Sequence, residues 1–148
     1  MDYRLIRATS GELEWLEQLR RIVYRELFFA TWGDWDESRH LRHFAESWER
    51  GGIDVVEVDG VRVGMIQLLE HPDAIEVGEI QIQPAHQGHG IGTSLLRDTI
   101  ARAHAQGKKV RLSTGLKNRR AFTLYQRLGF REVAQTDTHH HLECAPES

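Results

Sequence analysis

The stretch QPAHQGHGIG, residues 83–92, places Gly88, Gly90 and Gly92 between an alternating apolar segment and a helical pattern, so a strand is expected to lead through a glycine turn into a helix. Glycine lets the backbone approach a ligand closely. The first turn of a helix presents N–H groups without intrahelical partners and the positive end of the helix dipole. The stretch therefore predicts a cradle for a pyrophosphate group. The alternative is a tight turn whose glycines serve only steric needs, since glycine-rich patterns are weakly specific.

The spacing of these glycines excludes two common phosphate-binding motifs. A dinucleotide fingerprint would need a third glycine at position 93, which is Thr93. A P-loop would need a Gly-Lys-Ser/Thr sequence, which the chain does not contain.

The residues on either side of the turn predict an α+β fold. Asp59-Gly60 suits the two-residue turn of a hairpin, and Thr9 with Glu12 forms a capping box for a helix. Alternating patterns predict strands over residues 3–8, 53–58, 61–66, 75–83, 109–114, 130–133 and 136–143. Helical patterns follow Thr9 and cover residues 36–49, 91–106 and 118–128. We therefore expect a mixed sheet of about seven strands with about four helices.

Length and composition limit the classes of protein that this chain can be. Its 148 residues, 40% of them hydrophobic, predict one domain over residues 1–148. A formal charge of -3 argues against nucleic acid as a partner. The single cysteine, Cys144, argues against a disulfide framework or thiolate metal cluster, and no apolar run is long enough to span a membrane. We expect a cytoplasmic protein that binds no metal, no membrane and no nucleic acid.

Two motifs together resemble those of the GNAT superfamily of acetyl-CoA-dependent N-acetyltransferases. Residues 87–92, QGHGIG, resemble the family's Gln/Arg-x-x-Gly-x-Gly/Ala motif. Residues 118–130, NRRAFTLYQRLGF, resemble its Asn-x-x-Ala-x-x-Leu-Tyr-x-x-x-Gly-Phe helix. The motifs occur in the family's order, with a helix and a strand between them. Residues 31–35, TWGDW, also resemble a Trp-Gly-Trp segment of some small bacterial members.

The resemblance implies a GNAT fold and acetyl-CoA as co-substrate. It implies that Ile80 and Ile82 offer strand backbone groups to the thioester carbonyl and the pantetheine arm. It also implies that Asn118 caps its helix and touches the pantetheine arm, close to Tyr125. The residues implied to surround the pyrophosphate, mostly through backbone N–H groups, are Gln87, Gly88, His89, Gly90, Ile91, Gly92 and Thr93.

Acetyl transfer to an amine requires a base, a donor to the developing oxyanion and an acid for the departing thiolate. We assign the oxyanion donor to the Ile80 N–H and the acid to Tyr125, whose alternative role is core packing. Glu79 or Glu76 is the expected base. Three residues apart, they lie on opposite faces of a regular strand unless a bulge intervenes.

Three aromatic residues are expected to line the acceptor site: Tyr24, Trp32 and Trp35 could hold a cationic amine, although core packing is the alternative. Residues 139–141, three consecutive histidines, alternate across a strand, which favours a structural or substrate-lining role over a metal site. Some protein-acetylating members carry a glutamate where this chain has Ser113, and that difference argues against a protein substrate.

The sequence therefore predicts an N-acetyltransferase for a small primary amine, acting by direct attack in a ternary complex. The alternatives are acetylation of a protein or peptide and a non-catalytic acyl-CoA sensor. A homodimer is compatible with the sequence.

Overall fold

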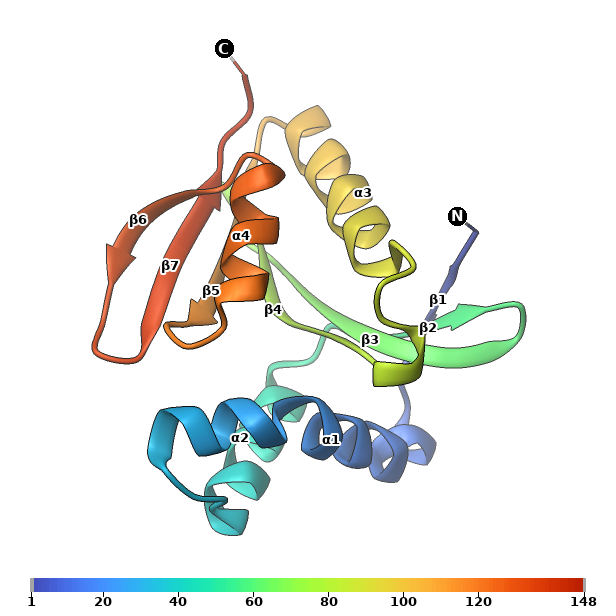
Figure 1. The fold of residues 1–148 in the computed structure, drawn as a ribbon. Coiled ribbons are helices and arrows are strands. Elements are labelled where there is room, and N and C mark those ends of the chain that lie inside the picture. Colours follow the sequence, from blue (N-terminus) through green and yellow to red (C-terminus); the bar gives the residue numbers. More distant parts are fainter. Residues whose placement is uncertain (1, 148) are drawn as a thin grey trace.

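Strands joined edge to edge form one mixed sheet in the order β1-β2-β3-β4-β5-β7-β6 (Figure 1). The structure is a computed structural model that describes residues 2–147, so that only residues 1 and 148 of the predicted domain lie outside it. Within these residues the strands are β1 Arg4–Arg7, β2 Ile53–Val58, β3 Val61–Glu70, β4 Ala74–Ile82, β5 Lys109–Gly115, β6 Arg131–Gln135 and β7 His139–Cys144. The predicted mixed sheet of about seven strands is confirmed.

The first four strands are antiparallel to their neighbours, β4 and β5 are parallel, and β7 lies antiparallel between β5 and β6. The predicted hairpin is confirmed, because both Asp59 and Gly60 have positive φ angles, 52° and 79°. The last strand begins at His139 instead of residue 136. Thr136 belongs to a tight turn, in which its N–H donates to the His139 C=O at 2.9 Å.

The helices lie on both faces of the sheet. Helices α1 and α2 cover one face, and α3 and α4 cover the other (Figure 1). In residues 2–147 the α-helices are α1 Leu13–Trp32, α2 Glu37–Arg50, α3 Ile91–Ala105 and α4 Arg119–Arg127, with short 3-10 turns η1 Ser10–Glu12 and η2 Pro84–His86. The predicted capping box is present, since the Thr9 N–H donates to the Glu12 carboxylate at 2.9 Å.

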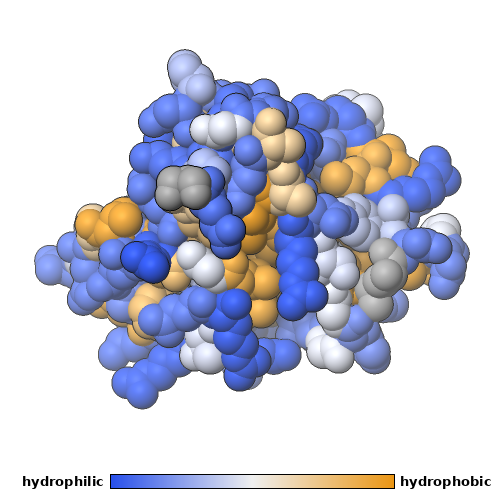
Figure 2. Space-filling view, turned by 90° about the horizontal axis from the view of Figure 1, so that it is seen from above, coloured by the Kyte–Doolittle hydropathy of each residue, from blue (hydrophilic) through white to orange (hydrophobic). Residues whose placement is uncertain are grey.

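Two apolar cores hold the helices to the sheet. The larger core lies between the sheet and α3 with α4, and it includes Ile66, Leu95 and Tyr125. The smaller lies under α1 and α2 and includes Leu19 and Met65. The surface above the sheet is mainly hydrophilic, with apolar residues visible in a recess near its centre (Figure 2). None of the helices in residues 2–147 has the length and apolar character needed to cross a membrane.

Candidate active site

The sheet opens in its middle, because β4 and β5 diverge after a short parallel contact (Figure 1). Their pairing ends at Val77 opposite Leu112, whereas β4 stays paired with β3 as far as Ile82. Among the residues that the structure describes, β4 therefore has no neighbouring strand on its β5 side from Gly78 to Ile82.

This free edge of β4 presents the backbone of both strand residues that were predicted to meet the coenzyme. The Gln83 N–H donates to the Val63 C=O at 2.8 Å. Hydrogen-bonded positions alternate along an antiparallel ladder, so the N–H and C=O groups of Ile80 and Ile82 point away from β3. The Ile82 C=O accepts a hydrogen bond from the Gln87 side chain at 2.9 Å. Ile80 directs both of its backbone groups into the opening.

The glycine turn follows β4 and leads directly into α3. Gly88 and Gly90 have φ angles of +81° and +83°, a left-handed conformation that favours glycine. A Cβ atom added at either position would meet no heavy atom within 4 Å, so open space lies beside this backbone. Gly90 is the N-cap of α3, and no side chain caps the helix. The N–H groups of residues 91–93 are therefore left without intrahelical or side-chain capping partners.

Asn118 and Tyr125 reach the opening from α4. The Asn118 side-chain oxygen accepts a hydrogen bond from the Ala121 N–H at 3.2 Å and caps the helix, as predicted. Tyr125 lies two helical turns later on the same face, where its ring packs 5.8 Å from that of Phe130. Burial raises the pKa of Tyr125 to about 12. Its phenol therefore keeps its proton at neutral pH.

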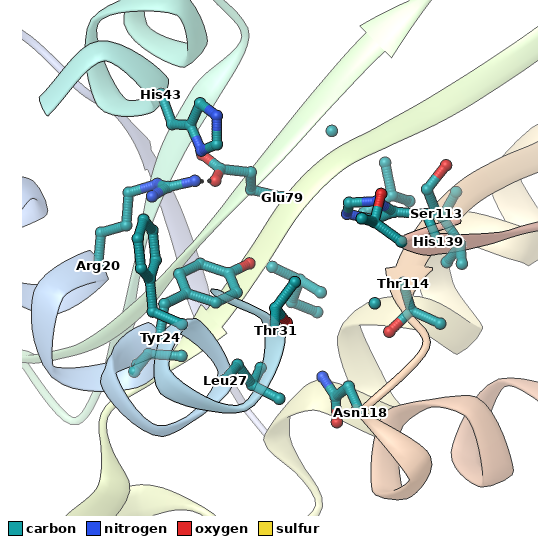
Figure 3. Close-up of a pocket in the computed structure, with 18 of the residues that line it drawn as sticks. Arg20, Tyr24, Leu27, Thr31, His43, Glu79, Ser113, Thr114, Asn118 and His139 are labelled. Carbon is teal, nitrogen blue, oxygen red and sulfur yellow. Dashed lines mark hydrogen bonds and ion pairs between the residues drawn. The ribbon is translucent and has the colours of Figure 1, made fainter. Parts of the chain in front are cut away.

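A cavity of about 320 Å³ continues the opening between the two halves of the sheet (Figure 3). Its lining includes Tyr125 and Ile80 together with side chains from two opposite sides. On one side lie Arg20, Tyr24, His43 and Glu79, and on the other lie Ser113, Thr114, Asn118 and His139. The cavity thus joins six elements: α1, α2, β4, β5, α4 and β7.

Glu79 is held in an ion pair at the edge of this cavity. Arg20 Nε lies 3.1 Å from one carboxylate oxygen, and both side chains are only 12% exposed. The Ser47 hydroxyl donates to the other oxygen. The Arg20 guanidinium also lies 4.9 Å from the centre of the Tyr24 ring. Desolvation raises the pKa of Tyr24, and the negative charge of Glu79 adds to the shift.

Glu76 lies outside the cavity lining, although it faces the same helix as Glu79. The register between β3 and β4 shifts next to Gly78, which has no partner on β3. This is a β-bulge, the alternative to a regular strand that the sequence analysis allowed. The bulge brings both carboxylates to the α2 side, where Glu76 accepts a hydrogen bond from Arg50 at 2.8 Å. Burial alone would raise the pKa of Glu76, but hydrogen bonds from Arg50, His71 and Arg111 outweigh it and lower the pKa.

Two of the three aromatic residues that were predicted to line the acceptor site lie in the cavity lining, and the third does not. Tyr24 and Trp32 line the cavity. Trp35 is outside that lining and packs against Phe28, with ring centres 4.8 Å apart, and against His40 at 5.1 Å. Trp35 therefore packs between α1 and α2 and stabilises this helix pair without lining the cavity.

The sequence did not indicate that His43 belongs to the site. It predicted a structural or substrate-lining role for residues 139–141 together, without singling out His139. Burial lowers the pKa of both imidazoles, and neighbouring arginines, led by Arg20, lower that of His43 further. Both rings are therefore neutral at pH 7. His140 points to the other face of β7 and stacks on Phe122 at 4.2 Å, which confirms the predicted alternation. No three metal-ligating side chains converge within residues 2–147.

Comparison with known proteins identifies the family. The profile of the acetyltransferase (GNAT) family matches residues 16–130. The chain belongs to the GNAT acetyltransferase family. Among curated proteins, it is similar to an uncharacterised N-acetyltransferase of Methanocaldococcus jannaschii, with 30% identity over 125 residues. The match covers 74% of this chain and 55% of that protein, so this GNAT chain spans about half the length of its curated relative.

Solved structures share the GNAT fold along nearly the whole chain. The PaiA N-acetyltransferase of Thermoplasma acidophilum, crystallised with coenzyme A, has a TM-score of 0.73 at 19% identity, with 98% of this chain and 99% of that chain covered. The ribosomal-protein-S18-alanine N-acetyltransferase of Escherichia coli has a TM-score of 0.72 at 18% identity, with coverage of 99% and 96%. At these identities the likeness shows the fold.

Proposed function

We propose that the protein transfers the acetyl group of acetyl-CoA to the primary amine of a small molecule, by direct attack in a ternary complex. One observation carries this proposal: the free edge of β4 and the Tyr125 side chain border one cavity, and β4 leads through the glycine turn directly into the uncapped start of α3. An extended thioester and a small acceptor can meet there without a covalent intermediate on the protein.

The residues around the opening fit coenzyme A. The left-handed Gly88 and Gly90 and the free N–H groups of residues 91–93 suit a pyrophosphate, which gains from both the hydrogen bonds and the helix dipole. The Ile80 backbone groups and the Ile82 N–H suit the amides of the pantetheine arm, in the manner of a strand added to a sheet edge. Asn118 borders the same opening.

The chemical roles follow from the same geometry. The Ile80 N–H donates to the oxygen that gains negative charge during attack, and such a donor is worth about 3 kcal/mol of barrier. Tyr125 gives its proton to the departing thiolate. Its pKa of about 12 keeps the phenol protonated, so a proton is at hand when the C–S bond breaks, and the phenolate then recovers a proton from the nitrogen that has formed the C–N bond.

Glu79 and Glu76 differ as candidates for the base. Glu76 lies outside the cavity lining, and hydrogen bonds from cationic side chains favour its ionised form. Glu79 lines the cavity, but Arg20 and Ser47 engage its two oxygens. Protonation of Glu79 would break an ion pair that is nearly buried. We therefore give Glu79 the role of holding Arg20 in place at the acceptor wall of the cavity.

The size of the cavity supports a small acceptor. A volume of about 320 Å³ lies at the lower end of the range for small-molecule pockets. Tyr24 and Trp32 give it aromatic walls against which an alkyl or aryl amine can pack. Acetylation of a peptide N-terminus is the second candidate, since an N-terminal residue with a short side chain would also fit a cavity of this volume.

A thiol-release assay tests the proposed function. The purified protein is mixed with acetyl-CoA and a panel of amines, amino acids, polyamines, aminoglycosides and peptides, and release of coenzyme A is followed. We expect turnover with a small amine and intersecting initial-rate lines, as a ternary complex requires. Turnover with peptides alone would favour the second candidate. Coenzyme binding by calorimetry without any turnover would favour an acyl-CoA sensor.

A further inference from the structure

An imidazole faces the cavity from the side opposite the Arg20–Glu79 pair (Figure 3). His139 is the first residue of β7, where it lies opposite Gly115 of β5, and Ser113 and Thr138 line the cavity beside it. Its Nδ1 is 2.8 Å from the Thr138 hydroxyl oxygen. Its other ring nitrogen, Nε2, has no hydrogen-bond partner among the residues that the structure describes.

We propose that His139 is the general base that removes a proton from the acceptor amine, with Thr138 as the residue that positions its ring. This inference rests on the proposed function and adds to it the group that makes the amine nucleophilic. In the required tautomer, Nδ1–H donates to the Thr138 oxygen and Nε2 keeps a lone pair that can face the cavity.

The surroundings of His139 favour it over the other candidates. Glu79 already accepts from Arg20 and Ser47, so its oxygens are occupied. His43 has Arg20, Arg39 and Arg42 as positively charged neighbours, which oppose a further proton despite the nearby Glu46.

The titratable group that acts on His139 is His141, its neighbour on the same face of β7. Ser113 Oγ is 2.7 Å from His141 Nδ1, and this hydrogen bond holds that ring. Desolvation and His141 both lower the pKa of His139, so its imidazole is in the basic form at neutral pH.

The proton balance of the reaction assigns separate tasks to His139 and Tyr125. A primary ammonium loses two protons when it becomes an amide. His139 Nε2 takes the first proton and passes it to water, and the free amine then forms the C–N bond as the C–S bond breaks. The amide nitrogen loses its second proton to Tyr125, which has given its own proton to the thiolate. The products are the amide, the free thiol and one proton in solvent.

The variant His139→Gln tests the assignment, with His141→Gln as the matched control from the same face of the same strand. We expect His139→Gln to lower kcat at pH 7 by about 100-fold, within the range for loss of a general base. Wild-type kcat should level off above the pKa of the imidazole. In the variant it should keep rising about tenfold per pH unit toward the pKa of the bound amine. His141→Gln should keep the wild-type kcat at its plateau, with the levelling moved to a higher pH because His141 no longer lowers the pKa of His139, and Kd for acetyl-CoA should change in neither variant.

Thr138→Val tests the positioning role, because valine keeps the shape of threonine and removes its hydroxyl. We expect kcat to fall about tenfold, a loss of about 1.4 kcal/mol that matches one hydrogen bond, while the levelling of kcat with pH remains. Imidazole added to the cavity variant His139→Gly should restore part of the rate in proportion to its concentration.

Two results would overturn the assignment while leaving the proposed function in place. One is an active enzyme in which His139→Gln keeps both the rate and the pH profile of the wild type. The other is loss of the levelling with pH in Glu79→Gln but not in His139→Gln, which would assign the base to the carboxylate. A wild-type protein that acetylates no amine would instead overturn both proposals.

Discussion

The glycine turn continues β4 and the cavity borders β4, but the two are built in different ways. The turn is one continuous segment, and it offers mainly backbone groups. The cavity takes side chains from six elements, so its shape depends on how α1, α2 and the two halves of the sheet pack. Substitutions at the turn should therefore change coenzyme binding, whereas substitutions around the cavity should change turnover or the packing of the helices.

The largest effect is expected for Tyr125→Phe, which removes the acid and leaves the ring in its core position. We expect kcat to fall between about 10²- and 10⁴-fold, while Kd for acetyl-CoA stays within a factor of about three. Steady-state rates and calorimetry measure the two quantities. Tyr3→Phe, which removes a hydroxyl bonded to Asp98 outside the cavity lining, is the control. Unchanged turnover in Tyr125→Phe would contradict the proposed acid.

Arg20→Met should have the next largest effect, on stability. It leaves Glu79, only 12% exposed, without its cationic partner, and breaking such a pair costs about 3 kcal/mol. Denaturant unfolding measures the loss. The control is Arg7→Met, because Arg7 is 68% exposed in its pair with Asp54 and should contribute less than about 1 kcal/mol. Equal losses in the two variants would mean that the cavity wall does not depend on the buried pair.

Gly90→Ala distinguishes coenzyme binding from backbone strain. Gly107, at the other end of α3, has a similar φ of +72° and equally open space beside it. Alanine at either position should cost about 1 kcal/mol of folding stability. Only Gly90→Ala should also weaken acetyl-CoA binding, by about tenfold or more, since its methyl group would occupy the space beside the start of α3. Equal Kd values for the two variants would exclude this turn as the pyrophosphate site.

The smallest effect is expected for Glu76→Gln. Because Glu76 lies outside the cavity lining, turnover should remain within a factor of about two. The variant should lose about 1 kcal/mol of stability at pH 7, since its ion pairs are partly exposed. The pKa of Glu76 is lowered in the folded state, so its contribution is present above the unfolded pKa and is lost as pH falls. The stability difference should therefore shrink as pH falls from 7 toward 4. A large fall in kcat would return Glu76 to the list of candidate bases.

The order of strands and helices could be predicted because each element carries its own local pattern. Asp59-Gly60 specifies a hairpin, Asn118 caps a helix, and the glycine turn separates a strand from a helix. The faces of Glu76 and Glu79 could not be predicted, since a bulge at Gly78 depends on pairing with β3. His43 gave no local signal, because the polar pattern of α2 does not indicate which of its residues meets a cavity formed with β4 and β7.

The amino-acid sequence is enough to predict the strands and helices of the mixed-sheet fold, the glycine turn and the family to which the chain belongs. These features depend on backbone conformation and on neighbours close in the chain. The packing of the chain in three dimensions sets which side chains face the cavity, pairs Arg20 with Glu79 and places His139 across from them. Those relations join residues more than fifty positions apart, and only the packing of the complete sheet and helices brings them together.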